Sequence, residues 1–304
     1  MERGRTCQRA WGHGVRVDIG GGRRLFFDMA GQEFEPDGAA LRRRPTLIAL
    51  HGSPGMSDHS ALSPALSPLA DAMRVIYLDI AGAGRSDDPP PGTPFSLDLW
   101  SDDLVRFCEA LEIEKPVVLG LSGGGFVAQA HAIRHPDHAA GFIFASTQAR
   151  LDPERSIAMF GRLGGAEAAK AARDYLCAPP DRATLAAFSR VCLPLYNRAP
   201  RSTEAGGRIV MRRRLSDDFH RYPDGIWHVM NLLDDLHRIR RPVLVLAGDE
   251  DPITPVEDSL DIAARIDPAL VTLVRLAGCG HGVWRDQPDR AFEIIRDFVA
   301  RIAP

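Results

Sequence analysis

The chain has 304 residues, 45% of them hydrophobic, so it can bury a sizeable core as one large domain or as a domain that carries an insertion. Its 37 basic and 40 acidic residues leave a formal net charge of -3, which gives no global positive field for nucleic acid or an anionic membrane. We therefore expect neither a nucleic-acid partner nor a membrane partner.

The amino-terminal stretch MERGRTCQRAWGHG is charged and glycine-rich, where a secretory signal would carry an apolar run of roughly 7 to 15 residues. No apolar run in the sequence approaches the roughly 18 residues that span a bilayer. The five cysteines are odd in number and scattered without a CxxC pair, which favours neither a disulfide framework nor a zinc site. We expect a cytoplasmic monomer or homodimer with no bound metal.

Short apolar runs alternate with helical stretches in the first half of the chain. VRVDI and RLFFDM resemble a first pair of strands, and TLIAL, RVIYLDI, PVVLGL and GFIFAS follow, each ending in small or polar residues. The stretch SLDLWSDDLVRFCEALEI places its apolar residues on one face at helical spacing. Strands that alternate with amphipathic helices predict an α/β fold with a mostly parallel central sheet flanked by helices.

The pattern changes after GFIFAS, where the sequence becomes rich in Ala, Arg and Asp with helical spacing, as in RSIAMFGRLGGAEAAKAARDYL. PVLVLAGDED and LVTLVRLAG then resume strands, and DRAFEIIRDFVARI closes with an amphipathic helix. Because a structureless loop of this length is improbable in a compact domain, we interpret residues 148–240 as a helical cap on a core of residues 1–147 and 241–304. Ligands of open α/β sheets bind at the carboxyl ends of the strands, the edge that such a cap would cover.

The pentapeptide GLSGG at residues 120–124 has the form G-x-S-x-G. In this form a serine lies at a sharp strand-to-helix turn with its hydroxyl exposed, and the glycines make room for the crowded backbone. The context fits, since PVVLGL precedes the serine as a strand and GFVAQAHAIRHP follows it as a helix. We predict Ser122 as a nucleophile; a tight turn with an incidental serine is the alternative.

A serine hydroxyl becomes a good nucleophile when a base takes its proton, and histidine can do so near neutral pH. His281 lies in LAGCGHGVW, directly after the predicted last strand, in a glycine-rich turn that can aim its ring over the sheet edge. His135 and His138 lie at a helix end, where a capping role is the better explanation. We therefore predict His281 as the base.

The base requires an acid that holds its tautomer and stabilises its charged form. Asp251 follows the strand PVLVLAG, in a loop stiffened by two prolines, and is the predicted acid. Asp249 is a weaker candidate two residues away, and Asp152, after GFIFAS, is a distant third. The order Ser122, Asp251, His281 is the one that this type of fold uses.

Charge on a substrate carbonyl oxygen needs fixed hydrogen-bond donors. Gly123 offers its N–H at the start of a helix, and HGSPG after TLIAL can supply a second donor. Pro54 has no N–H, so Ser53 is the predicted donor and Gly55 the fallback. An ordinary turn would also explain this loop.

Five segments together resemble the α/β-hydrolase superfamily with a helical cap, and most closely its prolyl-iminopeptidase-like branch. These are ALHGSPGMSDHS, VIYLDIAGAGRSD, GLSGGGFVAQAHAIRHPDH, LAGDEDPITP and GCGHGVWRDQP. The resemblance implies a catalytic triad of Ser122, Asp251 and His281 and an oxyanion hole at Ser53 and Gly123. The sequence departs from that branch in two places: it has HGSPG in place of HGGPG, and Gly123 in place of an aromatic residue.

We predict a cofactor-free serine hydrolase that cleaves an ester, amide or lactone of a small molecule. Alternatives are an aminopeptidase acting on a short peptide, a non-hydrolytic enzyme of this fold, and a binding protein that has lost turnover. An aminopeptidase needs carboxylates that face the substrate ammonium, and the predicted cap offers Glu154, Glu167 and Glu204. The residues predicted to bind substrate are Trp227 and Tyr196 in the cap and Trp284 beyond the base.

Overall fold

A computed structural model describes residues 14–200 and 209–303 of the chain. Its centre is a sheet of eight strands. From β6 to β10 the neighbouring strands run parallel, and β1 and β2 are antiparallel additions at one edge. In spatial order the strands are β1 (Val15–Asp18), β2 (Arg24–Ala30), β6 (Arg74–Leu78), β5 (Thr46–Leu50), β7 (Val117–Leu121), β8 (Gly141–Ala145), β9 (Val243–Gly248) and β10 (Val271–Leu276). The predicted, mostly parallel sheet is thereby confirmed.

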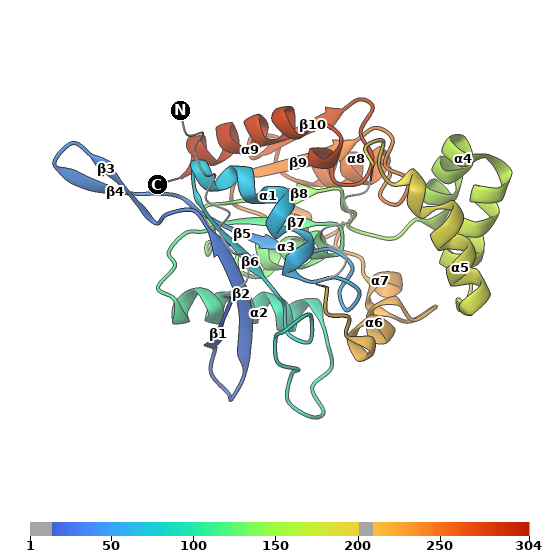
Figure 1. Cartoon of the computed structure of the whole chain (residues 1–304), viewed down its shortest axis with the longest axis horizontal. Helices are drawn as coiled ribbons and strands as arrows, with labels where there is room; N and C mark the ends of the chain where they lie inside the picture. The colour runs from blue at the N-terminus through green and yellow to red at the C-terminus, as the bar shows by residue number, and fades with distance from the viewer. Residues whose placement is uncertain (1–13, 201–208, 304) are drawn as a thin grey trace, which may run out of the picture.

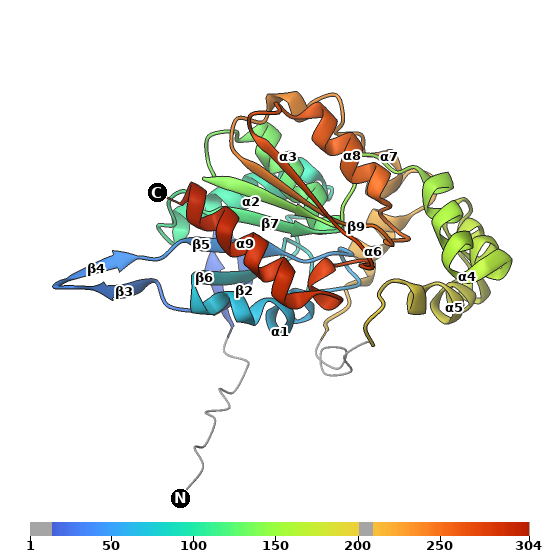
Figure 2. The same ribbon diagram turned by 90° about the horizontal axis from the view of Figure 1, so that it is seen from above.

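The central strands are apolar throughout because both faces of the sheet are covered (Figures 1 and 2). In β5, Ile48 and Leu50 pack with the helices of one face, and Leu47 and Ala49 pack with those of the other. The first face carries α2 (Leu97–Ala110), α3 (Gly123–Arg134) and α8 (Val256–Arg265). The second carries α1 (Ser63–Leu66) and α9 (Pro288–Ile302).

A second sheet of two strands projects from the body as a hairpin (Figure 1). Its strands are β3 (Phe34–Asp37) and β4 (Ala40–Arg43), and the exposed residues include Phe34 and Leu41. Five 3-10 helices complete the connections among the described residues: η1 (His59–Ala61), η2 (Ser67–Asp71), η3 (Leu193–Leu195), η4 (Leu236–Arg238) and η5 (Val283–Arg285).

The chain between β8 and β9 is helical, as the sequence pattern predicts. Its helices are α4 (Pro153–Leu176), α5 (Arg182–Val191), α6 (Arg213–His220) and α7 (Ile226–Val229). Aspartates before α4 and α5 accept hydrogen bonds from backbone N–H groups of the first turn, which fixes where these helices begin. In Figures 1 and 2, α4 and α5 stand apart from the sheet, and α6 and α7 lie closer to it. The division into a core and a cap at residues 148 and 240 remains our interpretation.

Among residues 14–200 and 209–303, no helix combines the length and the apolar character needed to cross a bilayer.

Candidate active site

The turn between β7 and α3 holds Ser122 in a strained backbone conformation, with φ 53° and ψ −120°. Glycines on either side let the backbone pack closely there. A Cβ on Gly120 would lie 2.4 Å from the carbonyl oxygen of Gly124, and a Cβ on Gly124 would lie 2.3 Å from that of Leu50. The sequence therefore needs glycine at both positions for α3 to begin directly after the serine, against the end of β5.

His281 is joined to a buried carboxylate. Its Nδ1 lies 2.8 Å from Asp251 Oδ2, and Asp251 is fully buried. The same carboxylate accepts the backbone N–H groups of Ile253 and Thr254, both at 3.0 Å, and the Thr254 hydroxyl at 2.8 Å. Because a carboxylate accepts hydrogen bonds, the neutral ring carries its proton on Nδ1, and Nε2 presents a lone pair.

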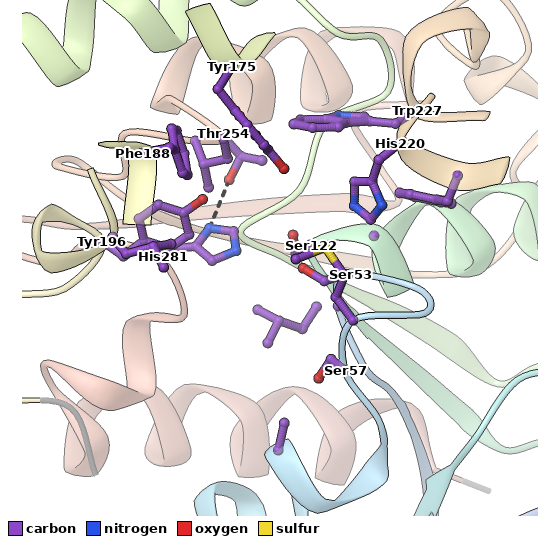
Figure 3. A pocket seen from close by; sticks show the side chains of 18 of the residues that line it. Ser53, Ser57, Ser122, Tyr175, Phe188, Tyr196, His220, Trp227, Thr254 and His281 are labelled. Carbon is purple, nitrogen blue, oxygen red and sulfur yellow. Dashed lines mark hydrogen bonds between the residues drawn. The ribbon is translucent and has the colours of Figure 1, made fainter. Parts of the chain in front are cut away.

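Ser122 and His281 line the same cavity, and Figure 3 shows the imidazole facing the serine. Among the described residues, however, no hydrogen bond joins Ser122 Oγ to the His281 ring. Catalytic hydrogen bonds are often long without substrate and tighten when it binds. The structure thus brings together all three residues of the predicted triad and forms one of its two hydrogen bonds.

The two weaker acid candidates are engaged elsewhere. Asp249 binds Arg275 at 2.9 Å on the surface, and this hydrogen bond raises the pKa of Arg275. Asp152 accepts the N–H of Glu154 at the start of α4 and lies 3.3 Å from Arg155. Neither carboxylate bonds to His281, so the geometry favours Asp251 over both.

The two predicted oxyanion donors are neighbours. Ser53 has a positive φ of 46°, and a Cβ on Gly123 would lie 3.3 Å from the Ser53 nitrogen. Within the described ranges, neither N–H donates a hydrogen bond to another residue, so both are available to a substrate oxygen. The same Cβ would lie 2.6 Å from Pro54 Cδ, so a larger residue at position 123 would require the HGSPG loop to shift. Gly55, the fallback donor, faces α6 and does not line the cavity.

Residues that the sequence reasoning missed hold the loop of His281. Asp286 accepts the N–H of Gly280 at 2.7 Å, and it also accepts the N–H groups of Arg198 and Ala199 at 2.9 and 2.7 Å. The hydroxyl of Ser146, after β8, accepts the N–H of Gly282 at 2.9 Å. These contacts join segments that are distant in sequence, so no local sequence pattern predicts them.

The segment after η3 adds two direct hydrogen bonds to this loop. The His281 N–H donates to the Tyr196 carbonyl oxygen at 2.6 Å, and Asn197 Nδ2 donates to the His281 carbonyl oxygen at 2.8 Å. The rings of Tyr196 and His281 meet edge to face, with centroids 5.4 Å apart. The helical insertion therefore helps to position the predicted base.

The cavity above Ser122 has a volume of about 260 Å³ and is mostly apolar. Core loops supply one side of it, and α4 to α7 supply the other (Figure 3). The predicted substrate-binding residues Tyr196 and Trp227 line it, together with Phe188. Tyr175 and His220, which the sequence analysis did not single out, line it as well.

The prediction for Trp284 is wrong. Its side chain is 3% exposed and packs with the apolar cluster beneath the sheet, against α9, so it does not line the cavity. The residue follows His281 closely in sequence, but η5 turns it into the core.

Two of the three candidate carboxylates of an aminopeptidase, Glu154 and Glu167, do not line the cavity. Glu154 pairs with Arg173 at 2.7 Å and Glu167 with Arg190 at 3.0 Å, in both cases on exposed helix surface. Glu204 lies outside the described residues. Among the described residues that line the cavity, there is no Asp or Glu.

One buried cluster has the residue types of a metal site: Asp58, His59 and Asp79. Its oxygens are already occupied by protein donors. Asp58 accepts Arg85 Nη1 at 2.9 Å and the hydroxyl of Ser60, while Asp79 lies 3.0 Å from His59 Nδ1. The cluster is therefore explained as a hydrogen-bonded support beneath the HGSPG loop.

The chain is similar to known proteins in sequence and in structure. A family model described as alpha/beta hydrolase fold matches residues 45–284. A proline iminopeptidase of Pestalotiopsis fici is 28% identical over 276 residues, which cover 84% of this chain and 92% of that protein. A 2-hydroxymuconate semialdehyde hydrolase of a Pseudomonas species is 27% identical, over 84% of this chain and 86% of that protein.

Among solved structures, the proline iminopeptidase of Mycobacterium smegmatis superposes with a TM-score of 0.74. The match covers 95% of this chain and 98% of that one, at 21% sequence identity. Identity this low shows a shared fold and does not by itself transfer an activity.

Proposed function

This chain belongs to the α/β-hydrolase family, and we propose that it is a serine hydrolase that cleaves an ester, amide or lactone of a small molecule through an acyl-enzyme. The observation that carries the proposal is the shared cavity of Ser122 and His281, with Asp251 2.8 Å behind the imidazole. The two unengaged N–H groups at Ser53 and Gly123 complete the set of groups that acyl transfer needs.

In the first half of the reaction, Ser122 Oγ attacks the carbonyl carbon while His281 Nε2 takes the hydroxyl proton. The carbonyl electron pair moves onto oxygen, where the N–H groups of Ser53 and Gly123 stabilise it. The carbon–oxygen or carbon–nitrogen bond to the leaving group then breaks, and the imidazolium returns the proton to the leaving atom. Asp251 stabilises the imidazolium during this step.

In the second half, a water molecule attacks the acyl carbon and gives its proton to His281. The bond to Ser122 Oγ breaks, the serine recovers its proton, and the carboxylic acid product leaves. No step requires an additional oxidant, reductant or cofactor.

A neutral substrate suits the cavity better than an amine. Burial of a substrate ammonium beside apolar side chains costs several kcal/mol unless a carboxylate pairs with it. The described lining residues include no carboxylate, and Glu154 and Glu167 pair with arginines elsewhere. These observations favour an esterase, amidase or lactonase over an aminopeptidase, which remains the second candidate because of the relatives of that name.

The proposal is tested with a fluorophosphonate probe and with 4-nitrophenyl butyrate. We expect one phosphonate per chain, mapped to Ser122, and a fall in ester hydrolysis of several orders of magnitude in Ser122→Ala with folding retained. The matched control is Ser67→Ala, which removes an exposed hydroxyl in η2. Labelling at another residue, or full activity in Ser122→Ala, contradicts the nucleophile assignment.

Parallel assays separate the two candidate functions. Turnover of proline 4-nitroanilide that exceeds turnover of the butyrate ester would favour the aminopeptidase. Faster turnover of the ester or of a lactone would favour the neutral substrate.

A further inference from the structure

His220 lies at the end of α6 and faces the proposed active-site cavity. Figure 3 shows its ring across Ser122 from His281, turned toward the serine. The preceding residue places α6 close to the reacting groups, since a Cβ on Gly123 would lie 3.4 Å from Phe219 Cζ. A histidine that the proposed catalytic steps do not use therefore lines the same cavity as Ser122 and His281.

The protonation of this ring follows from its contacts. His220 Nδ1 lies 3.0 Å from the carbonyl oxygen of Ser216, one turn earlier in α6. A carbonyl oxygen accepts hydrogen bonds, so Nδ1 carries a proton. Burial lowers the pKa of His220 to about 4; the hydrogen bond to Ser216 and the charge of Asp217 oppose this shift and His228 adds to it, so the ring is neutral near neutral pH.

The remaining ring nitrogen, Nε2, is then an acceptor. Among the hydrogen bonds of the described residues, none reaches His220 Nε2. Aromatic rings fix its direction: His220 meets Phe219 with centroids 4.8 Å apart and Trp227 with centroids 5.8 Å apart, both edge to face. The cavity thus contains an oriented, neutral acceptor in a largely apolar wall.

We propose that His220 is a specificity-determining residue whose Nε2 accepts a hydrogen bond from an O–H or N–H group of the substrate, near the scissile carbonyl. This inference rests on the proposed hydrolase function and narrows its substrate class to esters, amides or lactones that carry such a donor. An acceptor that the bound substrate shields from water without offering a donor loses its hydration, so the site disfavours analogues that lack the donor.

Matched esters test the proposal. The substrates are the 4-nitrophenyl esters of butyrate, 2-hydroxybutyrate, 3-hydroxybutyrate, their methoxy counterparts and N-acetylglycine, with release of 4-nitrophenolate as the readout. A methoxy group keeps the oxygen but removes the donor, so the hydroxy-to-methoxy ratio of kcat/KM isolates hydrogen-bond donation. For at least one donor position we expect a ratio of about 3 to 10 in the wild-type protein, the range expected for one neutral hydrogen bond.

Two variants assign the ratio to His220. His220→Phe keeps a ring against Phe219 and Trp227 but removes the acceptor, and we expect the ratio to fall to about 1. His220→Gln places a carbonyl oxygen near the former Nε2 and should restore part of the ratio. The control is His237→Phe at an exposed histidine that makes the same kind of bond, from Nδ1 to the carbonyl oxygen of Asp234 at 2.7 Å, away from the cavity. It should keep the wild-type ratio.

The outcomes separate failure of the His220 proposal from failure of the proposed hydrolase function. If the esters are hydrolysed in a Ser122-dependent way and no donor-bearing substrate is preferred, or if the preference persists in His220→Phe, the inference is overturned and the hydrolase assignment stands. If no ester is hydrolysed in a Ser122-dependent way, both fall.

Discussion

The two sides of the cavity are built by different interactions. On the core side, hydrogen bonds to backbone and carboxylate groups fix Asp251 and the ring of His281, whose backbone is held in addition by Tyr196 and Asn197 of the insertion. On the side of the helical insertion, aromatic packing forms the wall of the cavity. The ring of Tyr175 stacks on that of Phe188 with centroids 4.1 Å apart, and the ring of Phe188 meets that of Phe160 edge to face with centroids 5.7 Å apart. Hydrogen bonds fix the direction of a reacting atom, whereas ring packing fixes the shape of a volume. We therefore expect the core side to determine the rate of the chemical step and the inserted helices to determine which substrates reach it.

Asp251→Asn gives the largest expected effect in this comparison. The amide can present an N–H to His281 Nδ1 and so favour the tautomer with its proton on the wrong nitrogen. We expect kcat to fall by roughly 10³- to 10⁴-fold, by a similar factor for every ester. The measurement is kcat for esters of acetate to octanoate.

The control for this variant is Asp249→Asn, which removes a surface partner of Arg275. A fall of less than tenfold in Asp251→Asn, or an equal fall in the control, would show that Asp251 does not orient the base.

Phe188→Leu should have a smaller effect of a different kind. It removes the ring against Tyr175 and leaves space in the wall, so longer acyl chains should gain relative to short ones. We expect the octanoate-to-acetate ratio of kcat/KM to rise by about 10-fold, because one methylene in an apolar pocket is worth about 1 to 3 kcal/mol. Phe34→Leu in the exposed hairpin is the control. A uniform change for all esters would contradict the separation of rate from selectivity.

The smallest effect on activity is expected at the far end of α3, where three histidines cluster. His131 Nδ1 lies 3.1 Å from the Ser101 carbonyl oxygen, and its Nε2 lies 2.9 Å from His138 Nδ1. His135 pairs with Asp102 at 2.7 Å. Burial is the main cause that lowers the pKa of His131 to about 3 and that of His138 to about 4.

The sign of the pH effect follows from these values. Unfolding returns the pKa of His131 and that of His138 to about 6.5, so the unfolded state binds more protons in acid. The contribution of these groups to the free energy of unfolding is therefore highest above pH 6.5, and it falls as the pH drops from 6.5 toward 4.

We expect His138→Gln to flatten this pH dependence by about 1 kcal/mol between pH 7.5 and pH 5, measured by urea unfolding at both values. Relative kcat/KM values across the esters should stay unchanged. An unaltered pH dependence would contradict the assignment of the buried pair, and altered selectivity would contradict the comparison of the two sides.

Elements that depend on a local sequence pattern could be predicted from the sequence alone. The apolar runs predict the central strands, and the G-x-S-x-G pentapeptide predicts the turn at Ser122, because each depends on residues that are neighbours in the chain. The glycine-rich turn and the two prolines likewise predict the loops of His281 and Asp251, whose side chains lie 2.8 Å apart between Nδ1 and Oδ2.

The rest depends on long-range packing. Trp284 was misassigned because its direction is set by the turn of η5, which sequence proximity to His281 does not reveal. His220 and Tyr175 were missed because amphipathic helices show which residues are apolar, and not which part of that face meets the cavity. Asp286 was missed because its four backbone and side-chain donors come from two segments about 80 residues apart.

The carboxylate of Asp286 links the segment at Arg198 and Ala199 to the loop that carries His281. Because it bonds both to Gly280 and to the backbone at Arg198 and Ala199, an insertion or deletion next to those two residues would displace the neighbouring imidazole without contacting it. Efforts to enlarge the cavity should therefore substitute side chains that line it from α4 and α5, such as Tyr175 and Phe188, and keep the number of residues before Arg198 unchanged.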